Sequence, residues 1–239
     1  MTVLCHETVT VLCREKSTRM SITAASPRTE SPVIAPSSAV VTSETGLPFA
    51  WPLYRFSVKK YQELVQSGVF DEADAFELLE GLVVPKMSKN PRHDSTVDRC
   101  DRWLSRVIPA TWYARIQNSL VTSDSVPEPD LAVVRGEPDD YGERHPTGTN
   151  AALVIEVAES SLANDREKAR LYARAGVENY WIINVIDNQI EVFTDPLPGT
   201  GNYRTRRILL VGDEVSFDLP SGESIKLTVS SLLPKNSVT

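Results

Sequence analysis

The chain has 239 residues, of which 41% are hydrophobic and 24% are charged, and its formal net charge at pH 7 is −7. This composition is typical of a globular protein, and the acidic charge means that any contact with nucleic acid must use a local basic patch. There are three cysteines, no Cys-x-x-Cys or Cys/His spacing and no apolar run near about 18 residues, which excludes a disulfide framework, a structural zinc site and a membrane helix.

Residues 1–50 are rich in Ser, Thr, Pro and Val, show no sustained periodicity, and carry four acids and four bases that cancel. We expect a disordered N-terminal tail over residues 1–50 and one folded domain over residues 51–234. Charged residues come too early in this tail for the apolar core of a signal peptide. We therefore expect a cytoplasmic protein without a membrane partner.

The first elements of the domain are predicted from capping and turn residues. Ser57 can cap a helix that ends at Gly68, with the apolar side chains between them on one face. Residues 75–86 have the pattern of a β-hairpin, with its turn at Glu80 and Gly81.

A longer helix is predicted over residues 91–108, because apolar side chains recur there at helical spacing. His93 lies four residues before Val97, at the N-terminal end of the same face. Four arginines flank this helix and form a candidate patch of positive charge: Arg92, Arg99, Arg102 and Arg106. Arg166 and Arg170, later in the chain, are further candidate contacts for nucleic acid.

The middle of the chain has the pattern of one βαβ unit. Residues 152–158 are an apolar run with the composition of a strand buried on both faces. Asn164 or Asp165 can cap a helix that runs to Ala175, and a glycine follows it. A second β-rich run occupies residues 177–186. The two strands should therefore be parallel neighbours joined by a right-handed crossover.

Shorter β-rich runs lie on both sides of this unit. Before it we predict strands at residues 113–121 and 131–134 and a loop at 135–150. After it we predict a turn at residues 187–188, a strand at 189–194, a loop at 195–202, and strands at 204–211 and 224–229.

Two charged residues inside the βαβ unit are unexpected there. Glu156 interrupts the apolar strand, where an unpaired carboxylate would cost several kcal/mol. Lys168 lies three and four residues before Leu171 and Tyr172, which places it on the inward face of the helix. Either the two residues form a structural ion pair, or they form the floor of a functional site.

Asp130 extends this pair to three residues. It opens the strand that precedes the strand of Glu156, and two carboxylates on adjacent strands can hold a divalent cation through oxygen atoms. A backbone carbonyl and waters would complete the shell. Such an ion polarises a phosphoryl oxygen and lowers the pKa of a bound water, and Lys168 can position that water or offset developing charge. These residues are suited to metal-assisted phosphodiester hydrolysis.

Each of these residues also has a purely structural explanation. Asp130 follows a proline and could be a turn residue. Glu156 could simply pair with Lys168, or Lys168 could be a solvated residue paired with an acid on its own helix. His93 could be an ordinary half-buried histidine, and Glu80 could serve only the hairpin turn.

The order and spacing of these residues resemble a known family. The motifs that carry the resemblance are Glu80-Gly81, His93 at the start of a helix, Pro129-Asp130-Leu131, Ile155-Glu156-Val157 with Ser160, Asp165-x-x-Lys168-x-x-x-Tyr172, and Ala175-Gly176-Val177-x-x-Tyr180-Trp181. From about residue 54 to residue 233 the chain resembles the Uma2 family, whose members are restriction endonuclease domains of the PD-(D/E)XK nuclease superfamily.

This resemblance implies an α/β (α+β) restriction-endonuclease-like fold, with a mixed β-sheet flanked by helices. It also implies a site for Mg²⁺ or Mn²⁺ that is held by Asp130, Glu156 and the Val157 carbonyl. By the same analogy Glu80 completes the site and His93 lines it.

The lysine of the site departs from the superfamily pattern. The signature lysine would fall at position 158, where this chain has Ala158. Lys168 matches the helical lysine of the Uma2 pattern, and its ammonium can reach the same space. The resemblance therefore assigns the assistance of the attacking water to Lys168.

The function implied is that of a metal-dependent endonuclease whose partner is nucleic acid, in particular DNA, and homodimer formation stays open. The alternative is a catalytically silent module with the same fold that binds nucleic acid or protein, in which Glu156 and Lys168 form a structural pair. No Gly-x-Ser-x-Gly, Walker loop or His-Glu-x-x-His motif supports a small-molecule hydrolase of another fold.

We expect the N-terminal tail to contribute little to the stability of the domain, because its charges balance and it has no apolar periodicity. Deleting residues 1–49 should leave the melting temperature nearly unchanged in a thermal melt. A drop of more than about 5 °C, which corresponds to more than about 1 kcal/mol at this size, would show that the tail packs on the domain.

Overall fold

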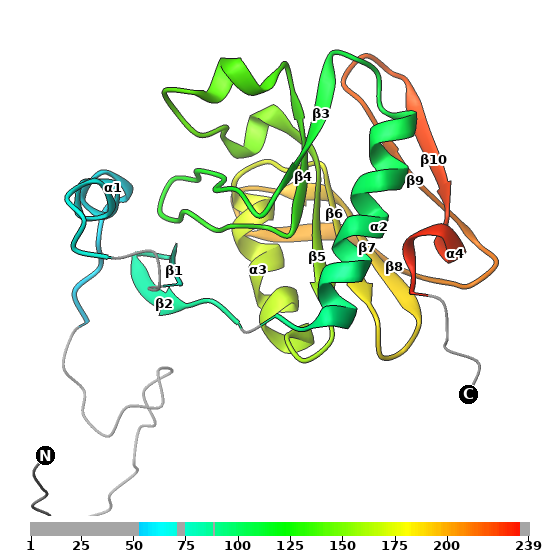
Figure 1. Ribbon diagram of the computed structural model, residues 1–239, viewed down its shortest axis with the longest axis horizontal. Helices are drawn as coiled ribbons and strands as arrows, with labels where there is room; N and C mark the ends of the chain where they lie inside the picture. Colours follow the sequence, from blue (N-terminus) through cyan, green and yellow to red (C-terminus); the bar gives the residue numbers. More distant parts are fainter. Residues whose placement is uncertain (1–52, 71–74, 88, 235–239) are drawn as a thin grey trace, which may run out of the picture. The chain divides into compact units, whose positions relative to one another are not determined.

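The computed structural model describes residues 53–70, 75–87 and 89–234 (Figure 1). The predicted tail over residues 1–50, like residues 235–239 at the end of the chain, lies outside the described residues. Every helix in the described ranges is too short or too polar to cross a lipid bilayer.

A six-stranded mixed sheet lies at the centre of the fold, with the strand order β3-β4-β5-β6-β7-β8. β5 and β6 are parallel, and the other neighbouring strands of this sheet are antiparallel. The strands are β3 (Trp112–Ile116), β4 (Leu131–Arg135), β5 (Ala151–Ala158), β6 (Asn179–Asn184), β7 (Gln189–Leu197) and β8 (Asn202–Leu210).

The predicted βαβ unit is confirmed: helix α3 (Leu162–Arg174) connects the parallel strands β5 and β6. Gly176 follows the helix with a positive φ of 73°, as expected of a residue that ends a helix. The start of α3 was predicted wrongly, because Ser161 and not Asn164 or Asp165 is the N-cap residue. The Asp165 carboxylate accepts a hydrogen bond of 2.5 Å from the Ser161 hydroxyl instead.

Two apolar cores cover the two faces of the sheet. Helix α2 (Pro91–Val107) packs on one face, together with the hairpin of β9 (Glu214–Asp218) and β10 (Ser224–Thr228) and with helix α4 (Val229–Leu232). Helix α3 packs on the other face (Figure 1). β5 supplies both cores, because Leu153, Ile155 and Val157 point towards α2 while Val154 and Ala158 point towards α3. Glu156 lies between Ile155 and Val157, so its side chain is on the same face as Val154 and Ala158 and points towards α3.

The segment before α2 forms a helix and a hairpin, as predicted. Helix α1 (Val58–Gln66) is capped by the Ser57 side chain, and strands β1 (Phe76–Leu79) and β2 (Leu82–Pro85) pair antiparallel. Glu80 and Gly81 form the turn with φ values of 48° and 78°, which is the conformation that a two-residue hairpin turn requires. Leu78 packs with Tyr61 and Val126 in a third, smaller core.

Some boundaries and elements differ from the prediction. The strand expected over residues 113–121 ends at Ile116, because Gln117 adopts a left-handed φ of 51°. Half of the loop expected over residues 195–202 belongs to β7 and β8, which are long strands with a short turn between them. Strand β9 (Glu214–Asp218) and helix α4 (Val229–Leu232) were not predicted, whereas β10 (Ser224–Thr228) was.

We predict that Gly148→Ala will destabilise the fold by about 1–3 kcal/mol, because it forces an atom into a packed contact. A Cβ added at Gly148 would lie 2.5 Å from both the Cβ and the carbonyl oxygen of Ala175, at the C-terminal end of α3. The free energy of unfolding in urea measures the effect. Gly199→Ala is the matched control, because its added Cβ meets no heavy atom within 4 Å. Equal stabilities of the two variants would contradict the prediction.

Candidate functional site

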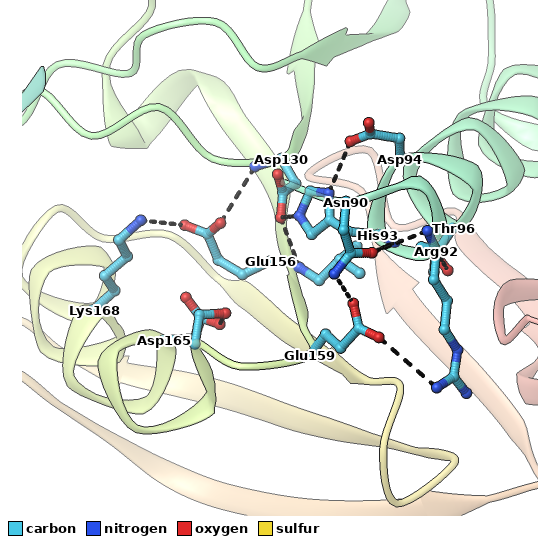
Figure 2. A network of polar contacts seen from close by, with 12 residues as sticks. Asn90, Arg92, His93, Asp94, Thr96, Asp130, Glu156, Glu159, Asp165 and Lys168 are labelled. Carbon is cyan, nitrogen blue, oxygen red and sulfur yellow. Dashed lines mark hydrogen bonds and ion pairs between the residues drawn. The ribbon is translucent and has the colours of Figure 1, made fainter. Parts of the chain in front are cut away.

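Asp130 and Glu156 lie side by side at the end of the β4–β5 pairing (Figure 2). Leu131 of β4 is paired with Ile155 of β5 in an antiparallel register. Asp130, which precedes Leu131, and Glu156, which follows Ile155, are therefore neighbours across the two strands. The Asp130 backbone N–H donates a hydrogen bond of 3.3 Å to Glu156 Oε2, and the Val157 N–H donates one of 2.8 Å to Asp130 Oδ2. The sheet thus brings the two predicted carboxylates together.

Lys168 reaches this pair from α3, as its predicted inward position requires. Its Nζ lies 3.2 Å from Glu156 Oε1, and its side chain is only 14% exposed. Tyr172 lies one turn further along the helix and donates a hydrogen bond of 2.9 Å from its hydroxyl to the same oxygen. Both oxygens of Glu156 are therefore engaged, and the predicted Glu156–Lys168 ion pair is present.

A further acid, Glu77 of β1, joins the cluster and was missed in the sequence. Its Oε1 lies 3.2 Å from Lys168 Nζ, and its Oε2 accepts a hydrogen bond of 3.2 Å from the backbone of Glu128, two residues before Asp130. The sequence does contain a pattern that could have identified it, because Glu77 lies between two apolar residues of a strand, as Glu156 does. Both acids are buried in the structure. Glu77 thus contacts both the ammonium and the segment that carries Asp130.

Glu80, which the resemblance assigned to the site, lines the same pocket, and its carboxylate is held by two arginines of α3. Arg170 and Arg174 each donate a hydrogen bond of 2.7 Å to it. Although burial opposes the shift, these guanidinium groups lower the pKa of Glu80. Glu80 therefore ties the hairpin turn to α3, and it is Glu77 that contacts Lys168.

His93 lies beside Asp130, as the resemblance implied. Asn90 caps α2 by accepting hydrogen bonds from the N–H groups of Arg92 and His93, which fixes the first turn of the helix. His93 Nε2 lies 3.0 Å from Asp130 Oδ2, and its Nδ1 lies 3.2 Å from Asp94 Oδ1 (Figure 2). The hydrogen bond to Asp130 raises the pKa of His93, and burial opposes that rise.

Negative charge exceeds positive charge in this cluster. Four carboxylates are buried around Lys168: Glu77, Asp130, Glu156 and Asp165. Burial raises the pKa of Glu156 to about 8, with Lys168 opposing the shift and the other carboxylates adding to it. Burial likewise raises the pKa of Asp165 to about 6. The pKa of Lys168 is raised even though desolvation opposes this, because Glu156, Glu77 and Asp165 surround the ammonium.

The cluster lines a pocket of about 440 Å³. The walls of the pocket come from the β1–β2 hairpin, the first half of α3 and the start of α2. Within the described residues, no group of three or more His, Cys, Asp or Glu side chains has a metal-binding arrangement. A metal in this pocket would therefore depend on two carboxylates together with backbone or water ligands.

Comparison with known proteins places this geometry in context. Residues 58–230 match the family model Uma2, which is described as "Putative restriction endonuclease". The chain is also similar to the crystal structure of a putative nuclease belonging to DUF820 from Anabaena variabilis ATCC 29413, with a TM-score of 0.57 and 16% identity, covering 74% of this chain and 97% of that chain. At this identity the similarity shows the fold alone. No curated protein matches the chain.

The raised pKa of Glu156 predicts a specific dependence of stability on pH. A carboxyl that binds its proton more tightly in the folded state stabilises the fold below its unfolded pKa, near 4.3, and loses that contribution as the pH rises through about 8. Glu156→Gln removes this titration. The difference in unfolding free energy, variant minus wild type, should therefore rise by a few kcal/mol between pH 5 and pH 8.

Denaturant melts at several pH values measure this difference. Glu167→Gln is the control, because Glu167 lies on the same helix with its side chain 70% exposed, and it should leave the pH dependence unchanged. A wild-type stability that rises with pH relative to Glu156→Gln would mean that Lys168 lowers the pKa of Glu156, and the prediction would be wrong.

Proposed function

Because the chain belongs to the Uma2 family of putative restriction endonucleases, we propose that it is a metal-dependent endonuclease that hydrolyses phosphodiester bonds of nucleic acid, in particular DNA. The family and the restriction-endonuclease-like fold were both predicted from the ordered motifs, and both are confirmed. The metal, the substrate and the roles of the individual residues are the content of the proposal.

The observation that carries the proposal is the pair of buried carboxylates on adjacent strands, set among further acids and a single lysine side chain. Burying several carboxylates together is costly unless cations compensate them. Lys168 supplies one positive charge against Glu77, Asp130, Glu156 and Asp165, and His93 contacts Asp130. A divalent cation would reduce the remaining excess of negative charge.

The residues present fit Mg²⁺ or Mn²⁺, which prefer oxygen ligands. Asp130 and Glu156 would supply two carboxylates and Val157 its carbonyl. The Val157 N–H already faces Asp130, and in an extended strand the N–H and C=O of one residue point to the same side. When bound, such an ion polarises a phosphoryl oxygen and lowers the pKa of a water ligand.

The other residues of the cluster have positioning and electrostatic roles in this proposal. Lys168 holds an ammonium beside Glu156, from which it can donate a hydrogen bond to an attacking water or to a phosphate oxygen. Glu77 holds that ammonium from the opposite side. Tyr172 orients Glu156, and His93 orients Asp130 by contacting one oxygen of its carboxylate.

One observation favours the alternative of a catalytically silent module. Both oxygens of Glu156 already accept hydrogen bonds from groups of the protein, as they would in a structural ion pair. In that case Glu156 and Lys168 would stabilise the fold without any metal. The two functions differ in how the stability of the protein responds to Mg²⁺.

We expect Mg²⁺ to stabilise the wild-type protein, since it binds only the folded site. The gain should be about 2.7 kcal/mol at a hundred times the dissociation constant, or roughly 5–10 °C in a thermal melt. Glu156→Gln keeps the shape of the side chain but removes a ligand charge, so it should abolish this shift while the metal-free protein becomes no less stable. Glu167→Gln should keep the shift, because this exposed acid is not a proposed ligand.

The structural pair predicts the reverse pattern. Loss of Glu156 would then leave Lys168 without one of its two carboxylate partners and destabilise the protein by about 3–5 kcal/mol, with or without metal. A badly destabilised Glu156→Gln beside a wild type that does not respond to Mg²⁺ would rule out the proposed nuclease site.

A further inference from the structure

Two of the four arginines predicted as a basic patch along α2 have partners within the protein. Arg92 lies 3.9 Å from the Glu159 carboxylate and donates a hydrogen bond of 3.2 Å to the Val185 carbonyl. The Arg106 guanidinium lies 5.3 Å from the centre of the Trp103 ring. The same helix also carries three aspartates, so its surface is close to electrically balanced.

A second group of arginines lies on the opposite side of the sheet, between α3 and β8. Arg166 and Arg170 of α3 and Arg206 of β8 line a cavity of about 440 Å³, together with Asn202 and Tyr203. We refer to Arg166, Arg170 and Arg206 with this cavity as the arginine cleft. The acid of its lining is Glu167, which pairs with Arg170 at 2.9 Å.

A buried carboxylate holds two of these arginines in place. Glu191 of β7 has 0% of its side chain exposed, and it accepts a hydrogen bond of 3.0 Å from Arg166 Nε and one of 2.8 Å from an Arg206 terminal nitrogen. The Arg206 guanidinium also lies over the Phe193 ring, 5.6 Å from its centre. The Glu191 carboxylate thus orients two guanidinium groups, and these three side chains together carry a net positive charge.

The two guanidinium groups remain accessible although Glu191 is buried. The side chains of Arg166 and Arg206 are 42% and 45% exposed, so their other N–H groups face solvent at the cleft. A guanidinium held in a fixed orientation matches the oxygens of a phosphate group and loses little entropy when it binds one. This geometry favours a phosphate ligand over a diffuse counter-ion.

The arginine cleft and the candidate active site share two lining residues. Glu167 and Arg170 line both cavities, one on each side of the outer edge of α3. Lys168 points from the same helix into the acidic pocket. A strand with one phosphate in that pocket could therefore cross α3 and place a following phosphate at the arginines.

We propose that the arginine cleft binds the phosphate backbone of nucleic acid beside the bond to be cleaved. This inference rests on the proposed nuclease function and adds a basic contact for the strand outside the acidic pocket. Phosphate contacts of this kind fix the position of the strand and carry no sequence information. The competing explanation is that Glu191 and its arginines only tie α3 to the sheet.

The test is the binding of a fluorescently labelled DNA duplex of about 20 base pairs, measured over a range of KCl concentrations with EDTA present to prevent cleavage. Arg166→Gln and Arg206→Gln should each weaken binding on the order of tenfold and reduce the slope of log K against log salt by about one. Arg206→Lys keeps the charge and should keep the slope, which covers the case in which a glutamine variant folds poorly. Thermal melts check that each variant is folded.

Arg207→Gln is the matched control. Arg206 is opposite Phe193 and Arg207 opposite Val192, so the two neighbouring arginines lie on opposite faces of the sheet, and both are exposed. Arg207→Gln should bind DNA as the wild type does. An equal loss of DNA affinity with Arg207→Gln would indicate that binding depends on diffuse charge and not on the arginine cleft. The proposal would also be contradicted if the cleft variants bound DNA as tightly as the wild type, or if the wild type did not bind DNA. The Mg²⁺-dependent stabilisation of the wild type tests the nuclease site separately, so the two proposals can fail independently.

Discussion

The fold around the candidate site depends on one interaction, the contact of the Lys168 ammonium with two buried carboxylates. Glu156 belongs to the central sheet and Glu77 to the hairpin before α2, and both lie 3.2 Å from Lys168 Nζ. The same ammonium therefore joins the hairpin, whose Leu78 packs in a separate small core, to α3 and the sheet. Without it, several carboxylates would share one poorly solvated pocket, and they would repel one another.

The distribution of charge separates two tasks that a nuclease has to combine. Polyanions are repelled by a pocket rich in carboxylates, whereas cations are attracted to it. The arginines held by Glu191 lie across α3 from that pocket, where they do not neutralise its acids. An acidic protein can in this way bring cations to one side of a helix and phosphates to the other.

Much of the fold and of the site was predictable because their signals are local. The alternation along β5 placed Glu156 on one face, the helical phase of Lys168 turned it inward, and the Asn90-capped helix brought His93 to Asp130. The remaining features depend on packing between distant segments. The family pattern pointed to Glu80 at the hairpin turn, but only the docking of the hairpin on α3 shows that Glu80 meets two arginines and Glu77 meets Lys168. Helix α4 was missed because its four residues are too few to show a helical period, whereas β9 was missed although its buried and exposed residues alternate as those of β10 do.

The contact of Glu77 has a consequence for how the protein matures. A growing chain releases the β1–β2 hairpin from the ribosome well before α3, and domains fold as units once their parts are available. Glu77 then has no cation to meet until the crossover helix is complete and packed on the sheet. The pocket is therefore assembled only in the finished domain, and a nascent or truncated chain would lack the proposed metal site.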